Sequence, residues 1–193
     1  DGYQGDLNNI YISQVGEYVQ KMRCVAGPHR PVFMVLQAFA WEMLREESDR
    51  DMTKVLYPLY PESRFMAFES LIQGANGIIY WGSFFTPKDS QCWADLKRVV
   101  REVADVADVL ATRRLPLELD IRYEEMGHSV DDGVQWTARE FQDKLYVFTC
   151  NADKNPCRAT LSSPAFRKYT QCDVLYENRT TKVSDGGITD DWK

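Results

Sequence analysis

Two short apolar stretches decide the fold that the sequence predicts: Pro-Val-Phe-Met-Val-Leu-Gln at residues 31–37 and Gly-Ile-Ile-Tyr-Trp-Gly at residues 77–82. Each is apolar on both alternating faces, which is typical of strands in a parallel sheet covered on both sides. Apolar residues at helical spacing occur before, between and after them, at residues 7–22, 65–75 and 93–110. This order of helices and strands predicts βα units around a parallel sheet.

Beyond residue 112 the pattern changes to short alternating runs separated by turn residues, which predicts an antiparallel β-sandwich. The predicted fold class is therefore α/β followed by all-β, with one domain at residues 1–112 and a second at residues 113–193. Two βα units cannot close a barrel of about 250 residues. The chain is accordingly interpreted as a fragment, with sequence missing at both ends.

Composition excludes several function classes. The 193 residues are 44% hydrophobic, which predicts an ordered core. Lys and Arg number 23 against 29 Asp and Glu, so the formal net charge of −6 disfavours a generic nucleic-acid or anionic-membrane binder. The longest apolar stretch, Val32 to Leu36, is far too short for a membrane span. The two histidines have no Cys or carboxylate at metal-ligand spacing and no nucleotide-binding motif occurs, so no metal and no cofactor is expected.

The cysteine pattern leaves two interpretations open. Five cysteines are an odd number, so at least one thiol is unpaired within the chain. Cys150 and Cys157 flank a turn-rich loop and are either a disulfide across a hairpin or two buried thiols. The first interpretation suits an oxidising compartment.

Candidate site residues follow the two apolar stretches, because ligands gather at the carboxyl ends of parallel strands. Gln37 ends the face that also carries Phe33 and Val35, and this predicts that it lies at the mouth of a barrel lumen. The alternative is that its amide is hydrogen-bonded to neighbouring loop backbone.

Aromatic residues accompany both strand ends. Phe39 and Trp41 stand beside Glu42 after the first, and rings next to a carboxylate favour sugar binding through stacking and charge-assisted hydrogen bonds. Trp41 could equally close the end of the core. The second strand end adds further rings at Tyr80, Trp81, Phe84 and Phe85, and together these rings predict an aromatic rim.

Arg64 opens the second predicted helix, where a cation opposes the helix dipole. This position suggests that Arg64 holds a carboxylate in the cleft. The simpler alternative is an exposed Arg paired locally with Glu62 or Glu69.

The stretches at residues 30–41 and 60–82 resemble the last two βα units of a glycoside hydrolase-type (β/α)8 barrel. Residues 145–152, 172–179 and 185–192 are similar to the small β-sandwich that follows the barrel in many of these proteins. The resemblance covers most of residues 1–192, and its motifs are architectural.

The resemblance implies hydrolysis of a glycosidic bond by two carboxylic acids. In many such barrels a catalytic Glu closes the seventh strand, whereas the similar strand here ends in Gln37 and is followed by Glu42. Glu42 is therefore the first catalytic candidate and Asp1 the second, while the usual proton donor would come from a strand outside this sequence.

Two hypotheses follow. The first is a secreted or periplasmic hydrolase of oligo- or polysaccharides, and the second is a non-catalytic glycan-binding or scaffold protein; a third interpretation is an enzyme acting on another small molecule. In the first two, the sugar site is lined by side chains at both strand ends and at the start of the second helix, namely Gln37, Phe39, Trp41, Arg64, Tyr80 and Trp81.

Overall fold

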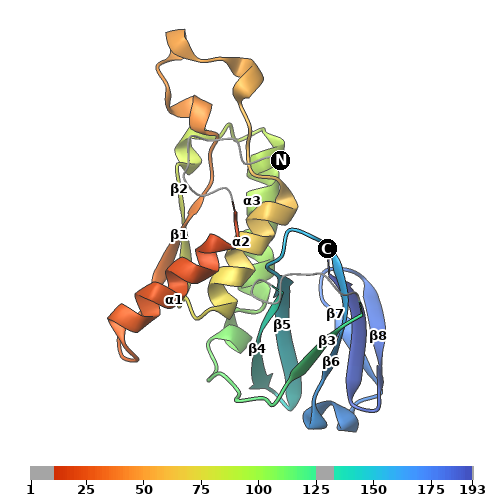
Figure 1. Ribbon diagram of the computed structural model, residues 1–193. Coiled ribbons are helices and arrows are strands. Elements are labelled where there is room, and N and C mark those ends of the chain that lie inside the picture. Colours follow the sequence, from red (N-terminus) through yellow and green to blue (C-terminus); the bar gives the residue numbers. More distant parts are fainter. Residues whose placement is uncertain (1–10, 125–132, 193) are drawn as a thin grey trace. The chain divides into compact units, whose positions relative to one another are not determined.

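The computed structural model describes residues 11–124 and 133–192, and contacts divide the chain into two compact units, residues 1–108 and 109–193 (Figure 1). The first unit contains α1 (Gln14–Ala26), β1 (Phe33–Gln37), α2 (Tyr60–Ile72), β2 (Gly77–Trp81) and α3 (Gln91–Asp105). The one-turn helix α4 (Ala107–Leu110) spans the boundary. The second unit contains β3 (Asp120–Tyr123), β4 (Val134–Phe141), β5 (Lys144–Asn151), β6 (Cys157–Ser162), β7 (Gln171–Val174), β8 (Arg179–Ser184) and β9 (Gly187–Trp192).

The first unit is built on one parallel strand pair. β1 and β2 are in register from Phe33 opposite Gly77 to Gln37 opposite Trp81. Their inner face contributes Leu36 to a core that includes Met66 of α2 and Val99 of α3. This core is possible because α2 and α3 present apolar residues at helical spacing to a sheet face whose side chains alternate.

The opposite face of the β1–β2 pair is exposed to solvent. Phe33, Val35 and Ile79 are 56%, 53% and 52% exposed. Both faces of the strand pair are apolar, but within the described part of the chain only the face that carries Leu36 is covered. Parallel strands usually have both faces covered.

A buried carboxylate connects α2 to α3. Glu102 of α3 is 4% exposed and accepts hydrogen bonds from Tyr60 Oη at 2.5 Å and Arg64 Nε at 2.8 Å. Arg98 Nε lies 3.3 Å from the same carboxylate, and its guanidinium stacks 3.9 Å from the centre of the Tyr60 ring. Burial and the bond to Glu102 raise the pKa of Tyr60 to about 12.

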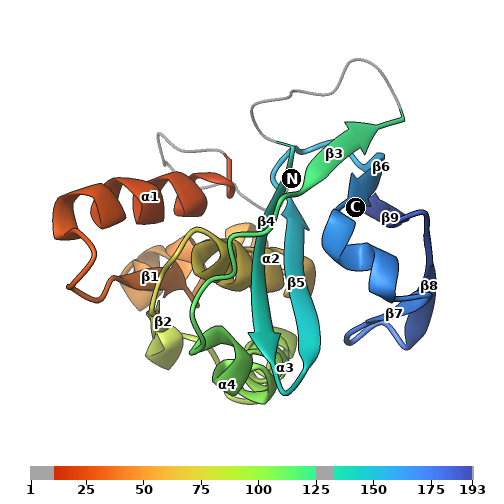
Figure 2. The same cartoon turned by 90° about the horizontal axis from the view of Figure 1, so that it is seen from below.

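The second unit consists of antiparallel strands. Its larger sheet has the order β3-β6-β9-β8-β7, and β4 pairs separately with β5 in the long hairpin visible in Figure 2. Ala159, Leu161 and Phe166 form the core of this unit, against which Leu145 and Val147 of β5 pack.

The predicted fold class is wrong. The described residues form an α+β arrangement of few helices and three small sheets, the only parallel one having two strands, and not part of a (β/α)8 barrel followed by a β-sandwich. The resemblance to a glycoside hydrolase barrel is wrong for the same reason. Two strands that are apolar on both faces predict parallel pairing, which is observed, but they do not determine how many strands the sheet contains.

Of the two interpretations of Cys150 and Cys157, the structure supports thiols and not a disulfide. Cys157 is a buried thiol at the start of β6, whereas Cys150 lies in β5, which belongs to a different sheet. The two residues therefore do not face each other across one hairpin.

No helix in residues 11–124 and 133–192 combines the length and apolarity that crossing a membrane requires.

Replacing Glu102 by Gln tests the link between α2 and α3. The variant loses the charge that faces Arg64 and Arg98, and we expect the free energy of unfolding of the first unit to fall by about 1–3 kcal/mol. Urea denaturation followed by circular dichroism measures the loss. Asp105→Asn, at an exposed position of the same helix, is the control and should change stability by less than about 0.5 kcal/mol. Equal stability of both variants would contradict a structural role for Glu102.

Candidate functional site

Hydrogen bonds join the segments that follow β1 and β2. Ala38 N donates to Trp81 O at 3.1 Å, which extends the strand ladder by one residue. The Thr86 hydroxyl donates to Ala38 O, and Thr86 is 1% exposed. Gln37 Nε2 donates to Phe39 O at 2.8 Å, so the local-backbone interpretation of this amide is observed. These bonds fix both segments at the carboxyl end of the sheet.

An aromatic cluster is assembled on this frame, and we call Phe39, Trp41, Trp81, Phe84 and Phe85 the aromatic rim. Phe39 is its buried centre, at 3% exposure. Its ring centroid lies 4.9 Å from that of Trp41 and 4.9 Å from that of Trp81, with interplanar angles of 69° and 77°. Edge-to-face pairs of this kind are worth about 0.5–1.5 kcal/mol each beyond the area they bury. The two indoles are therefore held in defined orientations.

The outer rings of the rim remain open to solvent. Trp41, Trp81 and Phe84 are 41%, 51% and 75% exposed. The ring centroid of Phe85 lies 3.8 Å from that of Phe84 and 6.4 Å from that of Trp81, which continues the cluster through the short 3-10 helix Ser83–Phe85. The rim thus combines a buried anchor with exposed flat apolar faces.

Gly82 permits the close approach of the two segments. Its φ is +76°, a left-handed value that favours glycine. A Cβ at this position would lie 2.7 Å from Cγ of Phe39, much closer than real Cβ contacts. The residue after β2 must therefore be a glycine for Phe39 to occupy the centre of the rim.

Glu42, the first catalytic candidate, is engaged in loop structure. Its side chain is 9% exposed; Oε1 accepts the Asp51 amide at 2.8 Å and Oε2 lies 3.3 Å from Arg45 Nε. Both oxygens therefore hold the segment that follows Trp41. The other candidate, Asp1, lies outside the described residues.

The same segment is held by a second carboxylate, that of Asp51. It accepts the Thr53 amide at 3.0 Å and the Thr53 hydroxyl at 2.6 Å, and Lys54 Nζ lies 3.1 Å away. These contacts, led by the hydroxyl bond, lower the pKa of Asp51 to about 2.

Two predicted site residues lie away from the rim. Tyr80 points to the opposite side of β2 from Trp81, because side chains alternate along a strand, and it packs with Ala38, Cys92 and Leu96. Burial raises the pKa of its hydroxyl. Arg64 binds Glu102 in the α2–α3 link, and neither Glu62 nor Glu69 is its ion-pair partner. Of the predicted sugar-site residues, the structure brings together Gln37, Phe39, Trp41 and Trp81.

Comparison with protein families, with characterised proteins and with solved structures finds no match to this chain. The expectation of a glycoside hydrolase therefore has no support from relatives, and the fold on which it rested is not observed.

Gly82→Ala tests the close approach at the rim. We expect a loss of about 2–4 kcal/mol in the free energy of unfolding, because left-handed strain and the clash with Phe39 add together. Gly27→Ala is the matched control: Gly27 has a φ of +69° but nothing within 4 Å of its Cβ position, so only strain, about 1–2 kcal/mol, is expected. Chemical denaturation measures both losses. Equal losses would show that Phe39 does not need the glycine.

The Asp51 contacts predict an acid-sensitive loop. The folded pKa lies below the ordinary 3.8, so the stabilisation is present above pH 3.8 and is lost as the pH falls toward 2. NMR titration of the Thr53 amide should show a midpoint near pH 2. Asp51→Asn should abolish this titration, and a midpoint near pH 4 in the original chain would contradict the contacts.

Proposed function

We propose that the protein binds carbohydrate through the aromatic rim without cleaving it. The observation that carries the proposal is the pair of half-exposed indoles, Trp41 and Trp81, held by the buried Phe39 ring. Flat apolar rings of fixed orientation suit the C–H-rich faces of sugar rings, and little conformational entropy is lost when such rigid side chains bind a ligand.

Polar groups next to the rim add hydrogen-bonding capacity for sugar hydroxyls. Gln37 uses one amide hydrogen on Phe39 O, which leaves its carbonyl oxygen as an acceptor. The Trp41 and Trp81 indoles each carry an N–H donor. Stacking with a few such bonds is the usual composition of a small-ligand site.

The engagement of Glu42 favours binding over hydrolysis. A glycosidase needs two carboxyl groups flanking the scissile bond, one of them free to attack or to activate water. Glu42 is nearly buried and its oxygens are occupied by the Asp51 amide and Arg45. Moving it toward a ligand on the rim would break both contacts.

An interface with another protein is the second candidate function. The observation that favours it is the exposed sheet face of Phe33, Val35 and Ile79, which lies on the same side of β1 and β2 as Trp81. Contiguous exposed apolar surface marks interaction sites of either kind.

A location outside the cytoplasm, where polysaccharides are encountered, is part of the carbohydrate proposal.

Affinity electrophoresis in gels that contain xylan, laminarin, glucomannan or hydroxyethyl cellulose tests the proposal. We expect retardation in at least one gel and, for Trp81→Ala and Trp41→Ala, a dissociation constant about 3- to 10-fold larger, which corresponds to the loss of one aromatic contact. Tyr18→Ala, on the exposed side of α1, is the control and should bind like the original chain.

Two results would overturn the proposal. Release of reducing ends from a retained polysaccharide, abolished by Glu42→Gln, would show catalysis. Absence of retardation in every gel, together with a dimer in solution that Trp81→Ala dissociates, would show that the rim is a protein interface.

A further inference from the structure

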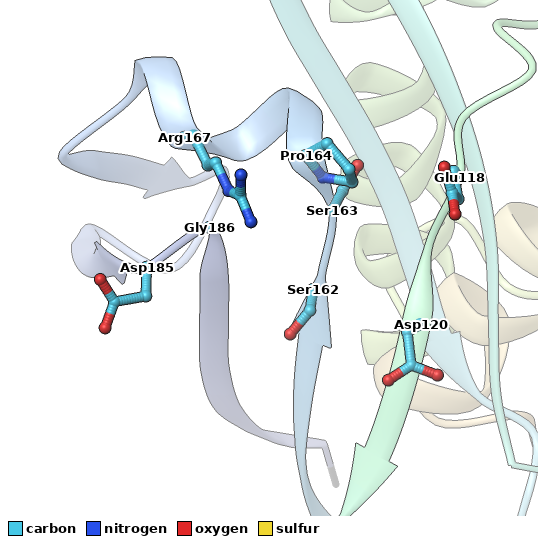
Figure 3. A pocket seen from close by; sticks show the side chains of 8 residues that line it. All are labelled: Glu118, Asp120, Ser162, Ser163, Pro164, Arg167, Asp185 and Gly186. Carbon is cyan, nitrogen blue, oxygen red and sulfur yellow. The ribbon is translucent and has the colours of Figure 1, made fainter.

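Charged side chains surround a small hollow of about 200 Å³ in the second unit (Figure 3). Glu118, Asp120, Arg167 and Asp185 line it, and all four are exposed. Exposed charges keep their hydration and need no further partner. The feature that lacks a partner lies instead in the first unit, at the outer edge of β1.

The backbone hydrogen-bonding groups of β1 alternate between its two edges. Ala38 N donates to Trp81 O of β2 at 3.1 Å, and every second residue of a parallel strand bonds to the same neighbour. The N–H and C=O groups of Phe33, Val35 and Gln37 therefore point away from β2. None of these backbone groups bonds to another residue in the described part of the chain. The outer edge of β1 is thus an unpaired strand edge.

This edge lacks the features that keep natural sheet edges from pairing, which are charged side chains, prolines and bulges. The edge strands of the five-stranded sheet have such protection, because β3 carries Asp120 and β7 carries Asp173. The sequence of β1, Phe-Met-Val-Leu-Gln, has no charged residue and no proline. Its outward residues Phe33 and Val35 are also more than half exposed. An unpaired apolar edge of this kind is a template for a further strand.

The outward residues of β1 are arranged symmetrically about Val35. When two copies of β1 meet antiparallel across a two-fold axis, Val35 lies opposite Val35 of the partner copy, and Phe33 lies opposite the partner copy's Gln37. Hydrogen-bonded pairs recur at every second residue of an antiparallel ladder, so all three outward residues form such pairs. The strand carries no charge, so identical strands meet without like-charge repulsion. The edge of β1 is therefore complementary to itself.

We propose that two copies of the chain associate through this edge, as an antiparallel pair of β1 strands. The product is a four-stranded sheet of order β2-β1-β1-β2, which relieves the marginal stability of a two-stranded sheet. Pairing along β1 covers on the order of 400 Å² per copy, which is at the low end of specific interfaces. We therefore expect a weak dimer, with a dissociation constant of roughly 10–100 µM.

The dimer joins two aromatic rims on one surface. The two-fold axis is perpendicular to the joined sheet, so both copies direct the same sheet face to the same side. Trp81 shares this face with Phe33 and Val35, because it pairs with Gln37 and side chains alternate along each strand. Two rims on one surface bind one polysaccharide chain more tightly than one rim does. This consequence rests on the proposed function, whereas the dimer itself does not.

Sedimentation velocity of the full chain in sugar-free buffer, from about 5 to about 500 µM, tests the proposal. We expect a concentration-dependent equilibrium of monomer and dimer. Val35→Lys should leave the chain monomeric, because the two lysines lie directly opposite each other. Ile79→Lys is the matched control and should keep the dimer. Ile79 is 52% exposed on the same sheet face, against 53% for Val35, but it belongs to β2.

Charge complementation adds a test of the strand register. Val35→Glu alone should also be monomeric, and an equimolar mixture of Val35→Lys and Val35→Glu should restore the dimer. A circular dichroism spectrum like that of the original chain verifies that each variant is folded. A monomer at every concentration of the original chain would overturn the proposal, as would a dimer that survives Val35→Lys or that Ile79→Lys disrupts equally. None of these results depends on sugar binding, so the dimer and the proposed function can fail separately.

Discussion

The parallel pairing of β1 with β2 is the constraint on which the first unit depends. It places Gln37 opposite Trp81 and so brings together two segments that follow the strands more than forty residues apart. A two-stranded sheet is marginal by itself. The pair is stabilised by burying Leu36 against Met66 and Val99, which links the sheet to α2 and α3.

The rim follows from this pairing through close contact at one glycine. Because Gly82 has no Cβ, Phe39 can enter the space between Trp41 and Trp81 and orient both indoles. A larger residue would separate the two segments and leave the rings without a common anchor. The inner ring is buried, whereas Trp41, Trp81 and Phe84 remain exposed around it.

Local sequence patterns predict the helices, the two parallel strands and the aromatic cluster. They do not predict contacts between residues that lie far apart in the chain. Sequence position suggests for Arg64 a cleft carboxylate, or Glu62 or Glu69, but its partner Glu102 is 38 residues away. Tyr80 and Trp81 are adjacent in sequence, which suggests a shared rim, but neighbouring side chains in a strand point to opposite faces. The barrel was wrong because two strands do not reveal how many others accompany them.

For the same reason, the role of a carboxylate cannot be predicted from the sequence until the groups that surround it are known. Aromatic neighbours of Glu42 suggest sugar binding and the barrel resemblance implies catalysis, yet its oxygens complete the hydrogen bonds of a loop. Glu102 lies in a segment with no sequence motif, yet helix packing brings its carboxylate to Tyr60 and Arg64. A carboxylate whose bonds are already made within the fold stabilises it, whereas a catalytic carboxylate must be free to reach a ligand. That distinction depends on long-range pairing, which residue type and spacing do not encode.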